Sequence, residues 1–328
     1  MKIINVRDAI GVTLCHDITK IVPGEFKGAA FRKGHVIREE DIEELLSLGK
    51  DHIYIWDDNE NLLHENEAAE ELFNMSAGEG TVAAEAKEGK IEIFADIDGL
   101  LKIDVDKLIE LNSIEEVILS TIRNNTVVKK GDKIAATKVI PLAIKKEKLI
   151  EAKNLLKEKI IKVVPIKAKK IAIVTTGNEV FYGRIKDASR AAISKKVEKY
   201  NCEIIGQSIL PDDKDKIQEA IKEWINKGAE LILCTGGMSV DADDVTPKAI
   251  KEVAGEIISY GTPIFPGAMF LVSYKEEIPV LGLPGGVIFS KSTTFDVFLP
   301  RILAGEKLTK KEIAKYSHGG LIITSEYL

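Results

Sequence analysis

The sequence predicts an α/β protein with an open, mostly parallel sheet and helices on both faces, preceded by a small αβ unit and a β-rich region. Short apolar strands alternate with amphipathic helices from 171 to 304, which is typical of a parallel sheet. Short β-rich runs separated by turn residues occupy 81–142, and one helix next to an extended run occupies 1–56. The length of 328 residues fits about two or three domains.

Composition excludes several classes of protein. With 45% hydrophobic and 30% charged residues the chain is typical of a globular protein, and no run approaches the ~18 apolar residues needed to cross a bilayer. We expect a cytoplasmic protein, because the first residues lack a secretory pattern. The net charge of −6 argues against a general nucleic-acid binder, although loops can still bind a small anion. Cys15, Cys202 and Cys234 are expected to be reduced structural thiols.

The residue pattern divides the chain into five expected parts. These are an N-terminal αβ unit at 1–77, a β-rich insert at 78–143, a lysine-rich helical linker at 144–165, an α/β domain at 166–306 and a tail at 307–328.

The first half contains three expected helices among short strands. One helix begins near Arg38 and is stopped by Gly49, and a second, with Leu62 and Leu63 in its pattern, runs to Ala77. A third lies around 107–111, within β-rich runs bounded by turn residues.

The second half alternates between strands and helices. Thr246 is expected to cap one helix, with Pro247 as the first helical residue. The expected strands are 171–176, 202–210, 230–235, 269–274 and 278–283, and the other expected helices are 185–200, 213–227 and 287–304.

Four loops of this half follow strands and are expected to open onto one edge, where open parallel sheets bind ligands. They are 175–179, 211–213, 235–244 and 283–286. Gly236 and Gly237 can let backbone N–H groups turn toward a phosphate, with hydroxyl donors from Thr235 and Ser239. Alternatively, the paired glycines only permit a tight turn.

Acidic residues come from three of these loops. Glu179, Asp212 and Asp244 offer the oxygen ligands that suit Mg²⁺, which could bridge phosphate oxygens. The alternative is helix capping, for which Asp212, Asp213, Asp243 and Asp244 are all placed. The shared edge favours a site for the set as a whole.

Other common motifs are missing from the sequence. It has no GxxxxGK[ST] loop, no GxGxxG opening the first helix of the α/β domain and no GxSxG elbow, so nucleotide-motor, classical dinucleotide and serine-hydrolase chemistry are unsupported. The five histidines lie outside the α/β domain without metal-ligand spacing.

The loops together resemble a known family. TTGNEV, PDD, TGGMSVDADDVTP and LPGG, in this order over 171–304, resemble the molybdopterin-binding domain of molybdenum-cofactor synthesis proteins, which include bacterial molybdopterin molybdenumtransferases and gephyrin. Residues 6–56 are similar to the N-terminal part of the same transferases. The resemblance implies the molybdopterin-binding fold and a homodimer.

The resemblance also implies a reaction and its residues. In that family adenylylated molybdopterin is cleaved to release AMP while molybdate is placed on the dithiolene, with Mg²⁺. Asp244, Asp212 and Glu179 would act in catalysis and hold the metal. The residues implied to bind molybdopterin or its adenylylated form are Thr176, Gly177, Thr235, Gly236, Gly237, Ser239, Thr246, Pro284, Gly285 and Gly286.

Several positions depart from the family pattern. Asn178 replaces an aspartate, 265–269 replaces a lysine-rich segment, and Gly286-Val287 replaces Asn-Pro. The acidic loop of the N-terminal region is missing, and we expect no complete C-terminal β domain. These changes keep the phosphate cradle and remove cations from the molybdate side. A non-catalytic molybdopterin carrier or sensor is therefore an alternative, and a third is a nucleotide pyrophosphatase resembling a domain of the nicotinamide-nucleotide amidase family.

Overall fold

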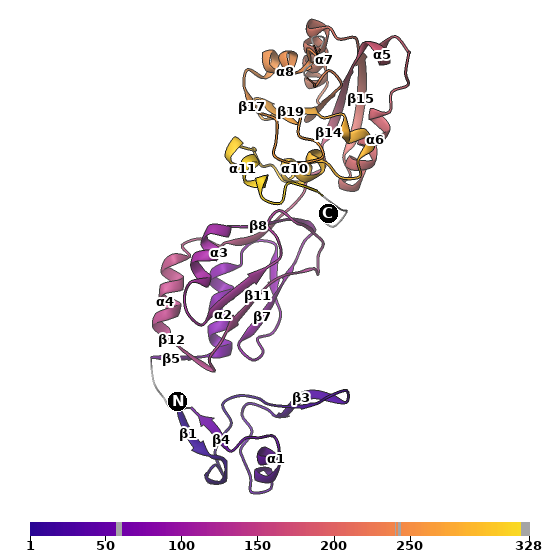
Figure 1. Ribbon diagram of the computed structural model, residues 1–328. Helices are drawn as coiled ribbons and strands as arrows, with labels where there is room; N and C mark the ends of the chain where they lie inside the picture. The colour runs from indigo at the N-terminus through magenta and orange to yellow at the C-terminus, as the bar shows by residue number, and fades with distance from the viewer. Residues whose placement is uncertain (57–60, 240, 242–243, 323–328) are drawn as a thin grey trace. The chain divides into compact units, whose positions relative to one another are not determined.

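The computed structural model describes residues 1–328 except 57–60, 240, 242–243 and 323–328 (Figure 1). It divides into two compact units, one of Met1–Ile97 with Leu101–Val163 and one of Asp98–Leu100 with Val164–Leu328. Within the described part, no helix combines the length and the apolar character needed to cross a membrane.

In its described residues, the start of the first unit contains two antiparallel strand pairs and one α-helix. The elements are β1 (Lys2–Asn5) paired with β4 (His52–Ile55), β2 (Ile18–Val22) paired with β3 (Phe26–Phe31), and α1 (Asp41–Ser47). The predicted helix is confirmed, and it stops before Gly49, whose φ of 74° is accessible to glycine at little cost.

The described remainder of the first unit forms three α-helices and short sheets. The helices are α2 (Glu65–Ser76), α3 (Val105–Asn112) and α4 (Lys146–Leu155). The sheets have the orders β6-β7-β11-β9, β10-β8-β13 and β12-β5. The strands are β5 (Leu62–His64), β6 (Thr81–Ala83), β7 (Lys90–Ala95), β8 (Gly99–Ile103), β9 (Val117–Thr121), β10 (Val127–Val128), β11 (Lys133–Val139), β12 (Ala143–Lys145) and β13 (Ile161–Val164).

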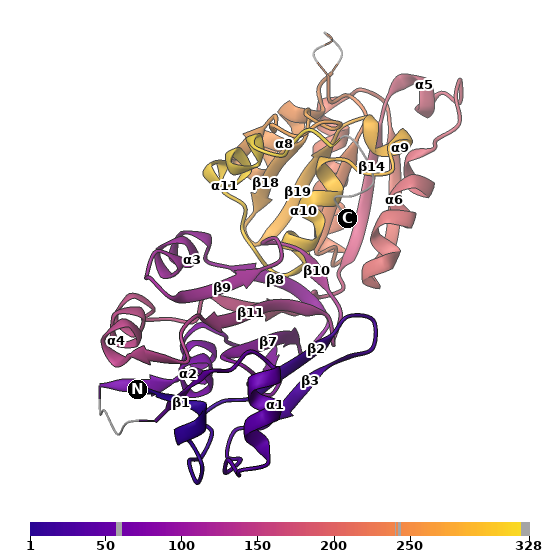
Figure 2. The same ribbon diagram turned by 60° about the horizontal axis from the view of Figure 1, so that its bottom comes forward.

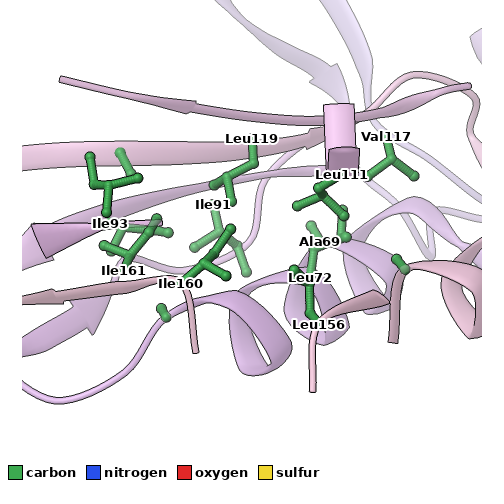
Figure 3. Close-up of a cluster of buried hydrophobic side chains, with 14 of the residues drawn as sticks. Ala69, Leu72, Ile91, Ile93, Leu111, Val117, Leu119, Leu156, Ile160 and Ile161 are labelled. Atoms are coloured by element: carbon green, nitrogen blue, oxygen red, sulfur yellow. The ribbon is translucent and has the colours of Figure 1, made fainter. Parts of the chain in front are cut away.

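One apolar core joins these helices and sheets. Figure 3 shows Ala69 and Leu72 of α2 beside Ile91 of β7. The lysine-rich segment, expected as a linker, contributes Leu149 and Ala152 of α4 to the same core, so its apolar face is buried.

Helix α2 starts later than expected. Leu62 and Leu63 lie in β5, because the side chain of His64 accepts the N–H of Asn66 and so caps the helix at its first turn.

The second unit is built on a six-stranded sheet of order β15-β14-β16-β19-β18-β17. β14 pairs in parallel with β15 and β16, β16 pairs in parallel with β19, and the last two pairs are antiparallel. The strands are β14 (Lys170–Thr176), β15 (Glu203–Leu210), β16 (Leu231–Thr235), β17 (Ile257–Tyr260), β18 (Leu271–Lys275) and β19 (Ile278–Leu283). The predicted open, mostly parallel sheet is confirmed.

Helices cover both faces of this sheet. On one face α7 (Lys214–Asn226) and α8 (Thr246–Ala254) lie side by side (Figure 1). On the other face α6 (Ser189–Val197), α10 (Thr294–Leu303) and α11 (Lys310–Ala314) enclose a second core (Figure 2). Two one-turn helices, α5 (Asn178–Phe181) and α9 (Gly286–Phe289), follow strands β14 and β19.

Two expected features of the second unit were wrong. The helix expected at 287–304 is broken, because Thr293 and Asp296 form a capping box that starts α10 afresh. Thr246 does not cap α8, since the N-cap is Val245 and Thr246 is the first helical residue.

Candidate functional site

The carboxyl ends of three parallel strands align at one edge of the sheet. Thr175 of β14 lies opposite Thr235 of β16, which in turn lies opposite Leu283 of β19. The β14–β15 pairing ends on Thr176 and Leu210. The prediction that the four loops open onto one edge is therefore confirmed by the strand register.

The connection between β17 and β18 lies at the same edge, because β17 and β19 are both antiparallel to β18 and therefore end on the same side of the sheet. Tyr260, the last residue of β17, pairs with Leu271, the first residue of β18, and Leu271 pairs with Gly282 near the end of β19. The connection 261–270, which includes the segment 265–269, therefore lies beside the site loops.

The glycine pair after β16 is required by the local geometry. Gly236 has φ 89°, and a Cβ there would overlap the carbonyl oxygen of Thr176. A Cβ on Gly237, whose φ is 53°, would lie 2.7 Å from Thr246 Oγ1, 3.1 Å from Thr176 Oγ1 and 3.4 Å from Asp212 Oδ1. Polar groups from three separate segments thus meet around Gly237.

Two of the predicted cofactor-binding threonines support this loop from within. Thr176 is 2% exposed and Thr246 is 0% exposed, and their hydroxyl groups are hydrogen-bonded at 2.9 Å. Thr235 is also buried, whereas Ser239 is exposed. The structure brings Thr176, Thr246, Gly236 and Gly237 together, and their contact with a cofactor stays a prediction.

Adjacent aspartates after β15 have different roles. The side chain of Asp213 accepts the N–H groups of Asp215 and Lys216 and caps α7, and the hydrogen bond from Lys216 lowers the pKa of Asp213. Asp212 instead accepts the N–H of Asn178 at 3.0 Å, across the edge of the sheet. The capping interpretation therefore holds for Asp213, and Asp212 joins two site loops.

The other two predicted acidic residues do not cap helices of the site either. Asp244 Oδ2 accepts the N–H of Asp241 at 3.0 Å, and α8 starts without a side-chain cap. Glu179 is exposed on α5, and its carboxylate folds back over Gly177, where a Cβ would lie 2.7 Å from Oε1. Asp243, with Val240 and Ala242, lies outside the described residues.

Across the described residues, no three or more His, Cys, Asp or Glu side chains are grouped so that they could hold a metal ion. Glu179, Asp212 and Asp244 are thus not a preformed ligand set. Mg²⁺ commonly uses one or two carboxylates together with phosphate oxygens and water, so the donors at this edge fit a cation that arrives with a phosphate ligand. The metal role of these residues stays a prediction.

The second glycine pair, after β19, is more open. Pro284 is buried, Gly285 is exposed and Gly286 is half-buried. Gly285 has φ −54°, and a Cβ on it would meet nothing within 4 Å. This loop therefore has room for a ligand beside its backbone.

A buried lysine holds the chain just beyond this second pair. Lys196 of α6 donates from Nζ to Asp296 Oδ2 at 2.7 Å and to the carbonyl oxygens of Lys291 at 3.0 Å and Ser290 at 3.2 Å. The lysine and aspartate side chains are only 10% and 1% exposed. This ion pair ties the segment after α9 to the helix that follows the first site loop.

A polar network supports the β14 loop. Asp187 accepts hydrogen bonds from Ser189 and from Gln207, and Gln207 also donates to Thr175 at 2.8 Å. Burial alone would raise the pKa of Asp187, but the hydrogen bonds from Ser189 and Gln207 outweigh it and the pKa is lowered. The sequence pointed to neither Asp187 nor Lys196, because each depends on partners distant in sequence.

The sheet and its polar edge define an open α/β domain of the class that binds ligands beyond the carboxyl ends of its strands. Residues 172–304 match the family model described as "Probable molybdopterin binding domain". The predicted resemblance is thereby confirmed for this region. Residues 3–57 match a model described as a domain of unknown function, DUF8806.

Part of the chain is similar to known proteins. The molybdopterin molybdenumtransferase of Haemophilus influenzae is 30% identical over 151 residues, covering 43% of this chain and 37% of the relative. A CinA-like protein of Thermosipho melanesiensis is 31% identical over 112 residues, covering 34% of this chain and 28% of the relative. The crystal structure of the molybdopterin biosynthesis enzyme MoaB from Thermus thermophilus is 21% identical, covers 42% of this chain and 98% of that chain, and has a TM-score of 0.37. The chain thus spans about a third of the length of these two curated relatives.

Proposed function

We propose that the second unit binds molybdopterin or adenylylated molybdopterin at this edge, and that the protein inserts molybdate with release of AMP in molybdenum-cofactor biosynthesis. The observation that carries the proposal is the meeting of Thr176, Asp212 and Thr246 around Gly237. The match of 172–304 to the molybdopterin-binding model supports it.

The glycine loop supplies the phosphate contacts. The positive φ values of Gly236 and Gly237 turn the loop so that its backbone N–H groups can face a phosphate, and the exposed Ser239 adds a hydroxyl donor. The hydrogen bond between Thr176 and Thr246 holds this backbone in place before the ligand arrives, which is how a preorganised site stabilises developing charge.

Asp212 and Asp244 would hold Mg²⁺ together with phosphate oxygens of the ligand. The cation would offset the negative charge that opposes attack on a phosphoanhydride. The N–H of Asn178 donates to Asp212 Oδ2 and so holds this carboxylate, while Asp212 Oδ1 lies on the side of Gly237. We further propose a homodimer, the commonest symmetric assembly.

The connection 261–270 supports a second candidate function. Its segment Phe265-Pro266-Gly267-Ala268-Met269 reaches the site edge without a cation, although a molybdate anion would need positive charge or N–H donors there. A non-catalytic carrier that holds molybdopterin for another enzyme fits this lack. A third candidate, a nucleotide pyrophosphatase, rests on the resemblance of the Gly236-Gly237 loop to a domain of the nicotinamide-nucleotide amidase family.

One assay separates the three functions. Purified full-length protein is incubated with adenylylated molybdopterin and Mg²⁺, with and without molybdate, and AMP is measured. Release that depends on molybdate supports the transferase, and tight binding without release supports the carrier. Cleavage of unrelated dinucleotides supports the pyrophosphatase, and a failure to bind adenylylated molybdopterin refutes the first two.

Replacing Asp244 tests the acidic residues. We expect Asp244→Asn to reduce Mg²⁺-dependent AMP release by ~100-fold or more, because the amide keeps the hydrogen bond to Asp241 but loses the charge that a hard cation needs. Asp213→Asn is the matched control, since it makes the same charge change at a residue whose side chain caps α7. Normal turnover by Asp244→Asn would show that the acidic assignment is wrong.

A further inference from the structure

Tyr260 contacts the loop that contains Gly236 and Gly237, although it belongs to none of the four loops predicted to form the site. It is the last residue of β17, at the same edge as the site loops. Its hydroxyl lies 2.7 Å from the carbonyl oxygen of Met238 and 3.3 Å from that of Ser239. A hydroxyl has one hydrogen to donate, so the shorter contact to Met238 is the principal hydrogen bond.

This hydrogen bond sets the direction of a peptide group. In a trans peptide the C=O and the N–H point in opposite directions. Because the carbonyl of Met238 points at Tyr260, the N–H of Ser239 points away from Tyr260. The tyrosine therefore fixes the orientation of the backbone donor that directly follows Gly237 and Met238.

The side chain of Met238 gives the loop a second anchor. Met238 is 5% exposed and packs on Gly282 of β19, where a Cβ would lie 2.7 Å from the methionine Sδ. The side chain holds the loop to the sheet, but it leaves the peptide plane free to turn. Among the hydrogen bonds between the described residues of this loop and its surroundings, those from Tyr260 are the ones that restrain this rotation.

The hydroxyl stays a donor at neutral pH, and the ring is not part of the core. Burial, together with the negative charge of Asp244, raises the pKa of Tyr260. The residue is 41% exposed, so removing its hydroxyl opens no cavity. Loss of the hydroxyl should therefore change the loop more than the fold.

We propose that Tyr260 is a positioning residue that orients the Ser239 N–H toward a bound phosphate group. The proposal rests on the proposed function, since it assigns the phosphate or pyrophosphate of the ligand to the Met238-Ser239 peptide. It adds a residue of β17 to a site whose other members come from the loops after β14, β15, β16 and β19.

The test compares Tyr260→Phe with Tyr274→Phe in the full-length protein. Tyr274 lies on the neighbouring strand β18, and its hydroxyl accepts the N–H of the buried Leu308 at 2.9 Å, far from the loop in sequence. Affinity for inorganic pyrophosphate with Mg²⁺ is measured by calorimetry, and KM and kcat are measured with adenylylated molybdopterin. Tm is measured for both variants.

We expect Tyr260→Phe to raise the Kd for pyrophosphate and the KM about 5- to 10-fold, with kcat within about twofold, as for the loss of one hydrogen bond. Its Tm should stay within about 1 °C of the parent. Tyr274→Phe should show the reverse pattern, with a Tm lowered by about 2–4 °C and unchanged affinity. Unchanged Kd and KM for Tyr260→Phe would overturn the proposal.

A readout without ligand separates this proposal from the proposed function. Amide hydrogen exchange of Ser239, followed by NMR, should change in Tyr260→Phe and remain at the parent rate in Tyr274→Phe. If the parent protein binds neither pyrophosphate nor adenylylated molybdopterin, the proposed function has failed and the phosphate assignment of Tyr260 falls with it. In that case an altered exchange rate of the Ser239 amide would still show that Tyr260 orients the loop. An unaltered rate would show that Tyr260 does not orient the loop either.

Discussion

The two glycine pairs of the second unit have the same sequence and opposite structural needs. Gly236 and Gly237 adopt positive φ values and are packed against Thr176, Thr246 and Asp212. Gly285 has an ordinary negative φ, and a Cβ on either Gly285 or Gly286 would meet nothing closer than 3.9 Å. The fold requires the first pair and tolerates a side chain in the second.

This difference changes what each pair says about ligand binding. The packing explains why Gly236 and Gly237 are glycines, so the phosphate assignment rests on the polar groups that meet around Gly237 and not on the glycines themselves. The second pair has no such packing constraint, so room for a ligand beside the backbone is a better reason for its glycines. The loop after β19 is instead held by the ion pair of Lys196 and Asp296.

The largest effect is expected at Lys196. Replacing it with Met leaves the carboxylate of Asp296 buried and uncompensated, which typically costs about 3–5 kcal/mol in the free energy of unfolding. Chemical denaturation measures this loss. Adding Asp296→Asn removes the stranded charge and keeps the cap on Thr293, so the double variant should regain part of the stability. A single variant as stable as the parent would mean that the second loop does not depend on the pair.

A smaller loss is expected for Gly236→Ala. The new Cβ would overlap the carbonyl of Thr176 at a φ that alanine rarely adopts, so we expect a loss of at least about 2 kcal/mol in the free energy of unfolding. The melting temperature and denaturant midpoint report it. Parent-like stability would remove the structural distinction between the two glycine pairs.

The smallest effect on stability is expected for Gly285→Ala, the matched change in the second pair. We expect the free energy of unfolding to change by no more than about 0.5 kcal/mol, because the Cβ enters open space. Its affinity for adenylylated molybdopterin should fall, since the same methyl group occupies the room beside the backbone. Unchanged affinity together with unchanged stability would leave the second pair without a role in binding.

The sheet could be predicted from the sequence because its central strands are recognisable from their own apolar residues. β14 contains the continuous apolar run 171–174 and β16 the run 231–234, and every residue of β16 is buried. The break between α9 and α10 was missed because apolar residues continue on both sides of 290–293, and the capping box of Thr293 was not recognised.

The site could be placed at one edge but not resolved residue by residue. Asp212 and Asp213 are equivalent in sequence, and only the backbone path decides that Asp213 caps α7 while Asp212 reaches Asn178. Tyr260 carries no motif, because its role depends on the antiparallel pairing that brings β17 to this edge. These roles depend on contacts between segments that are distant in sequence, and the hydrophobic periodicity of a sequence gives no information about such contacts.

Lys196 also has a chemical consequence. Its ammonium group has three hydrogens and three protein acceptors, whereas amine-modifying reagents need an exposed, deprotonated nitrogen. In a chain with 46 lysines and arginines, this lysine should resist acetylation or reductive methylation for as long as α6 and the segment before α10 remain joined. Modification of Lys196, detected by mass spectrometry over time, would therefore report when this contact opens.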